Sequence, residues 1–76
     1  MTKTQQEFFL AVYFKGEKEP MERYANGGAP EQAFVDFMAS FEQKESVEKV
    51  MIFETEHDYN SGSPPLKIFK PNAQNG

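Results

Sequence analysis

The chain has 76 residues, of which 38% are hydrophobic and 26% charged, and this describes one small domain. Because cysteine is absent, disulfides, thiolate nucleophiles and cysteine metal sites are excluded. Eight basic against twelve acidic side chains give a net charge of −4, which disfavours nucleic-acid binding. We expect no membrane span, since no run of about 18 apolar residues is present, and a cytoplasmic location, since Met1–Glu7 lacks an apolar signal core and cysteine is missing.

The composition is unusually aromatic, with eight Phe, three Tyr and no Trp. Each aromatic ring can bury about 150–250 Å², whereas ordering the chain costs about 1.5 kcal/mol per residue, so a domain this small needs its rings inside. An exposed ring would need a specific reason.

The first half of the chain predicts a β-hairpin. Residues 7–15 are almost wholly apolar and rich in aromatic and β-branched types, which is typical of a central strand buried on both faces. Gly16–Pro20 predicts a turn. Met21–Ala25 then alternates apolar and charged residues, and because Pro20 cannot donate to a ladder we expect a half-exposed edge strand.

A helix is predicted to follow. Pro30 suits a first helical residue, with acidic and amide side chains just behind it. The apolar residues that recur at helical spacing are Phe34, Phe37, Met38 and Phe41. They form one stripe on a helix of about 14 residues that ends near Lys44–Ser46.

The second half predicts two further strands. Val47–Glu56 contains a buried centre, Val50–Phe53, and is followed by nine turn-forming residues, 57–65. A short strand is predicted at Leu66–Lys70. The expected fold is therefore α+β, in the order ββαββ, with a small antiparallel sheet and one helix packed across one face. Residues 1–76 form a single domain, and we expect residues 1–6 and 71–76 to be frayed.

Both faces of the predicted sheet are apolar. Alternation places Phe8, Leu10, Val12 and Phe14 on one side of the first strand, and Phe9, Ala11 and Tyr13 on the other. The third strand divides in the same way, into Val50 with Ile52 and Met51 with Phe53. One helix covers only one face, so either the long loop and the tail fold back over the second face or another molecule covers it.

Catalytic chemistry has little support. His57, the only histidine, lies within Glu54–Asp58, where carboxylates could orient a base or share a cation; the alternative is a solvated strand end. In a strand, Glu54 and Glu56 would face away from His57, and there is no second histidine for zinc.

Other catalytic devices are also lacking. The serines have no elbow sequence around them. Gly27–Gly28 before a helix could cradle an anion, but Pro30 removes a donor and no Lys-Ser/Thr follows, which favours a simple turn. We expect no pocket of about 300 Å³ or more in so small a domain. The prediction is a protein that is not an enzyme and has no metal or cofactor.

Acidic residues gather at the hairpin, at the helix end (Glu42, Glu45 and Glu48) and after the third strand. Such clusters either engage a basic groove on a partner or serve as an ordinary solubilising surface. Tyr59 opens a polar loop that either carries recognition or is simply flexible. The candidate partner-binding residues are Glu17, Glu19, Glu22, Glu54, Glu56, Asp58 and Tyr59.

The layout resembles a known class of proteins. A Phe-rich hairpin leads into the helix Pro-Glu-Gln-Ala-Phe-Val-Asp-Phe-Met-Ala, then into the strand Val-Met-Ile-Phe-Glu and a short last strand. In layout, size and charge, residues 7–70 look like the small proteins with which bacteriophages and mobile elements disable host machinery, anti-CRISPR proteins among them. The resemblance implies stoichiometric inhibition in the host cytoplasm, without turnover, and assigns no individual binding residue.

Two functional hypotheses follow. In the first, the chain is an inhibitor that occupies a site on a host defence or nucleic-acid-handling complex, through acidic patches and a sheet edge or face. It would touch neither nucleic acid nor membrane directly. In the second, the chain is a self-associating structural or regulatory module whose free sheet face forms a symmetric homodimer.

Overall fold

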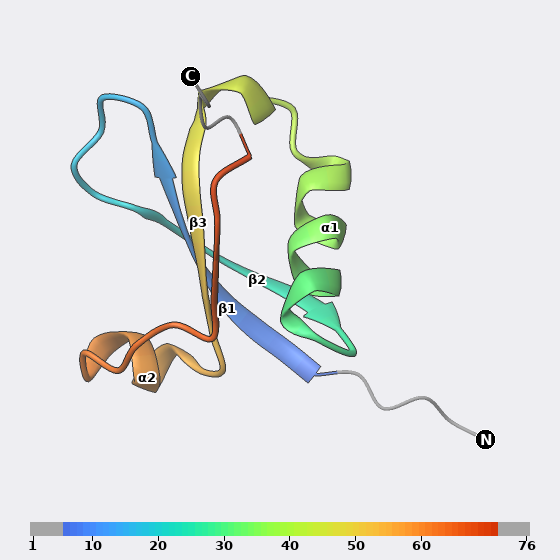
Figure 1. Ribbon diagram of the computed structural model, residues 1–76, viewed down its shortest axis with the longest axis vertical. Helices are drawn as coiled ribbons and strands as arrows, with labels where there is room; N and C mark the ends of the chain where they lie inside the picture. The colour runs from blue at the N-terminus through green and yellow to red at the C-terminus, as the bar shows by residue number, and fades with distance from the viewer. Residues whose placement is uncertain (1–5, 72–76) are drawn as a thin grey trace.

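The computed structural model describes residues 6–71 and contains one four-stranded antiparallel sheet in the order β2-β1-β3-β4. The helix α1 lies against one side of this sheet (Figure 1). In chain order the elements are β1 (Gln6–Phe14), β2 (Met21–Gly27), α1 (Pro30–Ser40), the 3₁₀ turn η1 (Lys44–Ser46), β3 (Val47–Phe53), α2 (Glu56–Asn60) and β4 (Lys67–Phe69). The predicted α+β sheet with a helix across one face is confirmed.

The central strand β1 is buried on both of its faces. Its residues Phe8 to Val12 are at most 3% exposed, and β1 pairs with β2 on one side and β3 on the other. Phe8, Leu10 and Val12 pack into the cluster beneath α1, whereas Phe9 and Ala11 belong to a second cluster. The predicted division of the two faces is therefore correct, because side chains alternate along a strand.

The hairpin between β1 and β2 also follows the prediction. Gly16 has φ 81°, a left-handed conformation that glycine adopts without steric cost, and the Glu17 amide donates to the Phe14 carbonyl at 3.0 Å. Within residues 6–71, β2 pairs only with β1 and so forms one edge of the sheet.

The helix α1 begins at Pro30 as expected but ends earlier. Its apolar stripe packs onto the sheet as predicted, with Phe37 buried and Phe34, Met38 and Phe41 partly buried against the same cluster. Phe41 leaves the helix in an extended conformation (φ −92°, ψ 129°), with its ring 4.9 Å from that of Phe37 and 5.8 Å from that of Phe14. The helix therefore has 11 residues, and the Phe41 ring packs against the core just beyond its end. The turn η1 follows as a separate element.

The expected strand Val47–Glu56 is too long, and the loop after it is not free of secondary structure. β3 ends at Phe53, and the Thr55 hydroxyl accepts the Asp58 amide at 3.1 Å as the N-cap of α2. The cap gives the Asp58 amide a hydrogen-bond partner at the start of α2. If the strand continued instead, this amide would need a partner on another strand. The last strand, expected from Leu66, begins at Lys67.

The predicted frayed ends fall mostly outside the described residues. Gln6 is already part of β1, and Pro71 is the last described residue; residues 1–5 and 72–76 lie outside the described range. No helix in residues 6–71 is long and apolar enough to cross a membrane.

The contact between β2 and α1 leads to a stability prediction. A Cβ atom at Gly27 would lie 2.8 Å from the Ala33 backbone nitrogen and 3.0 Å from the Gln32 Cβ atom. Gly27→Ala should therefore lower the free energy of unfolding by about 1–3 kcal/mol, because the helix must move away from the strand. Urea unfolding followed by circular dichroism measures the change.

The neighbouring glycine supplies the control. A Cβ atom at Gly28 would approach only the Gln32 Oε1 atom, at 3.6 Å. Gly28→Ala should change the free energy of unfolding by less than about 0.5 kcal/mol. Equal effects of the two substitutions would contradict a specific close approach at Gly27.

Candidate functional site

The sheet face away from α1 is covered by α2. The Tyr59 ring lies 5.0 Å from the Phe9 ring and 5.3 Å from the Phe53 ring, and it packs on the buried cluster of Phe9, Ala11 and Phe53. Figure 1 shows α2 and the hairpin turn on the side of the sheet opposite α1. Of the two ways in which this face could be covered, the structure shows the loop folding back, through Tyr59, which was predicted to open a loop that either carries recognition or is flexible.

A hydrogen bond ties α2 to the edge strand β2. The Tyr24 hydroxyl donates to the Glu56 Oε1 atom at 2.7 Å, and the Tyr24 ring meets the Phe9 ring edge-on, with 5.4 Å between centroids. The hydrogen bond, followed by partial burial and then the nearby carboxylates, raises the pKa of Tyr24 above 10.0. This hydrogen bond and the contact with Phe9 hold the exposed Tyr24 ring in one position on the surface.

Four carboxylates surround Tyr24 and Tyr59. The negative charges of Glu56, Glu7 and Glu22 all contribute to raising the pKa of Tyr24. The pKa of Tyr59 is raised mainly by burial, then by the neighbouring phenol of Tyr13, with smaller contributions from the charges of Glu22 and Glu19. The strand register agrees, because alternation places Glu7 on the face of Phe9, and Glu22 lies opposite Ala11 on that same face.

We refer to this surface as the acidic aromatic face. It draws on β1, β2, the hairpin turn and α2, and it consists of Phe9, Tyr13, Tyr24 and Tyr59 with Glu7, Glu19, Glu22 and Glu56. Lys49 borders this face, because its ammonium lies 4.9 Å from the centre of the Tyr13 ring. Lys67, by contrast, reaches Glu31 of α1 at 3.6 Å, so the lysines 49 and 67 serve opposite faces and form no common stripe.

The predicted binding residues are brought together only in part. Glu19, Glu22, Glu56 and Tyr59 all belong to the acidic aromatic face. Three others lie in different surroundings. Glu17 lines a separate hollow beside Phe14 and Gln43, Glu54 is exposed at the bend after β3, and Asp58 is half-buried with its amide bonded to Thr55.

Sequence reasoning missed Glu7, Tyr24 and the helix α2. Period-two alternation from Phe9 would have placed Glu7 on the second face. The hairpin register, in which Phe9 pairs with Tyr24, would have added the second ring. The pattern Thr55-x-x-Asp58 is a helix-start signal, and it was available for α2.

His57 shows no arrangement that supports catalysis. It lies exposed on α2, and its carbonyl accepts the Ser61 amide at 2.9 Å. The expected alternation of Glu54, Glu56 and His57 along a strand is wrong, since Glu56 and His57 are helical and Glu54 follows the strand. In the described part of the chain, no three His, Cys, Asp or Glu side chains are grouped so that they could hold a metal ion.

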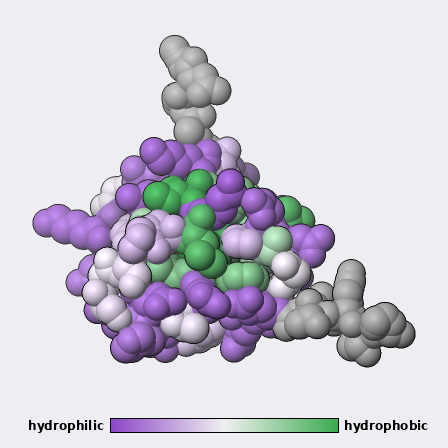
Figure 2. All heavy atoms as spheres, turned by 60° about the horizontal axis from the view of Figure 1, so that its bottom comes forward, coloured by the Kyte–Doolittle hydropathy of each residue, from purple (hydrophilic) through white to green (hydrophobic). Residues whose placement is uncertain are grey.

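Exposed hydrophobic side chains occur on more than one part of the described surface. Figure 2 looks from the end at which α2 lies and shows a central hydrophobic group framed by hydrophilic side chains. The large hydrophobic residues that are half or more exposed are Tyr24, Val35, Leu66 and Ile68. Tyr24 belongs to the edge strand β2 and Ile68 to the opposite edge strand β4.

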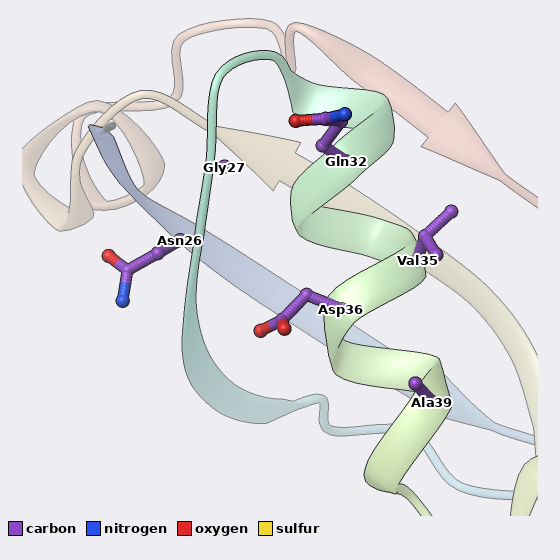
Figure 3. Close-up of a pocket in the computed structure, with 6 residues that line it drawn as sticks. All are labelled: Asn26, Gly27, Gln32, Val35, Asp36 and Ala39. Atoms are coloured by element: carbon purple, nitrogen blue, oxygen red, sulfur yellow. The ribbon is translucent and has the colours of Figure 1, made fainter. Parts of the chain in front are cut away.

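A hollow of about 390 Å³ lies between β2 and α1. We expected no pocket of roughly 300 Å³ or more in a domain of this size, and this hollow is larger. Figure 3 shows the Asp36 side chain directed from α1 toward the side on which Asn26 lies. The lining contains no histidine or serine, and its residues are Asn26, Gly27, Gln32, Val35, Asp36 and Ala39.

Comparison with protein-family models, with curated proteins and with solved structures finds no match. What the chain does must therefore follow from the chemistry of its own surface. The acidic aromatic face brings carboxylates and tyrosines from β1, β2, the hairpin turn and α2 into one surface.

The covering of Phe9 by Tyr59 can be tested by truncation. Tyr59→Ala should lower the free energy of unfolding by about 2–3 kcal/mol, because it removes a half-buried ring from two aromatic contacts. Tyr59→Phe keeps the ring and should cost less than about 1 kcal/mol. Chemical denaturation measures both; a loss as large for Phe as for Ala would show that the ring contacts are not what holds α2.

The Tyr24–Glu56 bond predicts a pH dependence. Glu56→Gln removes the negative charge and should move the pKa of Tyr24 down toward 10.0. In the native chain, the pKa of Tyr24 is higher in the folded state than in the unfolded state. The hydrogen bond to Glu56 therefore stabilises the fold fully below the unfolded-state pKa, and this stabilisation is lost as pH rises through the folded-state pKa, above pH 10. Carbon-13 NMR of the Tyr ring carbons reports each pKa, and an unchanged value for Tyr24 would contradict the contact.

Proposed function

We propose that the chain is a non-enzymatic binding protein that occupies a basic site on a larger host protein or nucleoprotein complex. The observation that carries the proposal is the convergence of Glu7, Glu19, Glu22 and Glu56 around exposed and half-buried tyrosines on one sheet face. This is the mode of action implied by the resemblance to phage-encoded inhibitors.

Charge and rigidity both support this proposal. The four carboxylates make the face suitable for arginines and lysines of a partner. The tyrosines supply large contact area with little conformational entropy to lose. Tyr24 is already held by Glu56 and Tyr59 by Phe9 and Phe53, so binding would require little further ordering.

A basic site on a nucleic-acid-handling complex is the kind of target that fits. Such sites hold phosphates with lysine and arginine side chains. A folded surface that presents several carboxylates can compete for those side chains without contacting nucleic acid itself. Inhibition by occupancy needs no catalytic group, which agrees with the exposed and isolated position of His57.

The symmetric dimer through the second sheet face is the weaker alternative. Its premise was an uncovered apolar face, but Tyr59 packs over Phe9 and Phe53 there. The carboxylates around that face would also repel those of a second copy brought against it.

The test measures partner affinity after charge reversal. A tagged chain is used to capture the partner from a lysate of the host cells, and the purified partner is then titrated by isothermal calorimetry. Glu7→Lys/Glu19→Lys should weaken binding by about tenfold to a hundredfold, because two attractive charges become repulsive. Binding of the native chain should also weaken as salt increases.

The helix end provides the matched control. Glu42→Lys/Glu45→Lys changes the net charge by the same amount at exposed positions just beyond α1. It should leave the affinity within about twofold of the native value. If this variant loses affinity while the Glu7/Glu19 variant keeps it, the acidic aromatic face is not the binding surface.

A further inference from the structure

The two edges of the sheet are open and carry exposed apolar side chains. In the described range, β2 pairs only with β1, and β4 only with β3. Tyr24 on β2 is 51% exposed and Ile68 on β4 is 50% exposed, with Leu66, also 50% exposed, just before β4. Tyr24 lies opposite Phe9 and Ile68 opposite Met51, so both project from the sheet face away from α1.

Backbone groups at these edges are available for pairing. The Glu22 carbonyl accepts a 2.9 Å bond from the Arg23 guanidinium, so this carbonyl points away from β1. Because the direction alternates along an antiparallel strand, the N–H and C=O groups of Tyr24 and Asn26 point outward as well. The same alternation can be followed from β2 through β1 and β3 to β4 by the residues that pair. It leaves the N–H and C=O groups of Ile68 pointing outward from β4.

We propose that a second copy of the chain pairs its β4 antiparallel with β2, so that the sheet continues from one copy into the next. In this register Ile68 lies opposite Tyr24, Lys70 opposite Glu22, and Leu66 opposite Asn26. Tyr24 and Ile68 both carry outward backbone groups, which allows a hydrogen-bonded pair between them. The Leu66 amide donates to the Ile52 carbonyl of its own copy at 2.7 Å, so Leu66 contributes its side chain only. The two exposed apolar side chains, Ile68 and Tyr24, cover each other.

The directions of the strands agree with this arrangement. Each neighbouring pair in the order β2-β1-β3-β4 is antiparallel, so β4 runs opposite to β2 within one copy. Placing a second copy beside the first by translation therefore brings β4 against β2 in an antiparallel sense. The α1 helices of both copies then lie on the same side of the continued sheet.

Charge complementarity favours unlike edges over like edges. The β4 segment carries Lys67 and Lys70, whereas the β2 edge carries Glu22 and borders the hollow that holds Asp36. Lys67 projects on the α1 side of the sheet, where it reaches Glu31 of its own copy at 3.6 Å, and the hollow beside β2 lies on that same side. Pairing β4 with β4 would instead bring the basic segments of two copies together.

The resulting contact is heterologous, since two different edges meet. Each added copy leaves one free β2 and one free β4, so assembly continues with concentration unless a ring closes. This association differs from the symmetric dimer through the sheet face, and it does not depend on the proposed partner binding.

Sedimentation velocity on the full chain, from ~20 µM to ~1 mM, tests the proposal. The weight-average mass of the native chain should rise above 8.7 kDa as concentration increases. Glu22→Lys and Lys70→Glu should each weaken association by about threefold to tenfold, because each puts like charges opposite one another. The combined charge swap should restore it, as should an equimolar mixture of the two single variants.

Controls separate edge pairing from general charge effects. Glu42→Lys and Lys18→Glu make the same charge changes at exposed positions outside β2 and β4, and they should leave association unchanged. Circular dichroism verifies that every variant is folded. A mass that stays monomeric over the whole range overturns the proposal. So does association that Glu22→Lys and Lys70→Glu do not change, or that the charge swap does not restore.

Discussion

The burial of β1 on both faces is the constraint on which the rest of the structure depends. Its five central residues have no polar side, so each face of the sheet needs a cover. The helix α1 supplies one with its stripe of Phe and Met. The other comes from Tyr59, which a short helix carries back over Phe9.

The aromatic content follows from this two-sided burial. On the α1 side, Phe34 stacks on Phe69 at 4.2 Å and Phe37 on Phe41 at 4.9 Å, which ties β4 and the helix end into the core. On the other side, Tyr24 and Tyr59 contact Phe9 through their rings. Tyrosine suits that side because its ring can pack inward while its hydroxyl reaches a carboxylate or another phenol.

Covering the second face also creates its charge pattern. Folding α2 over the sheet brings Glu56 to Tyr24, next to the carboxylates that alternation already places on β1 and β2. The acidic aromatic face is thus a consequence of how a small domain closes its core. Within residues 6–71, β2 and β4 each pair with one strand only, so both sheet edges are open there.

Sequence alone determined the order of the four strands and of α1, the edge position of the second strand, the helix stripe and the assignment of residues to two faces, but not α2. These features depend on local periodicity, which a short chain displays directly. Only the tertiary structure decided that Phe41 leaves the helix, that the strand stops at Phe53, and that Tyr59 turns inward. It also decided which carboxylates meet. Glu7, Glu19, Glu22 and Glu56 span fifty positions of the chain, and their convergence depends on strand register and on the fold of α2, neither of which is visible in local pattern.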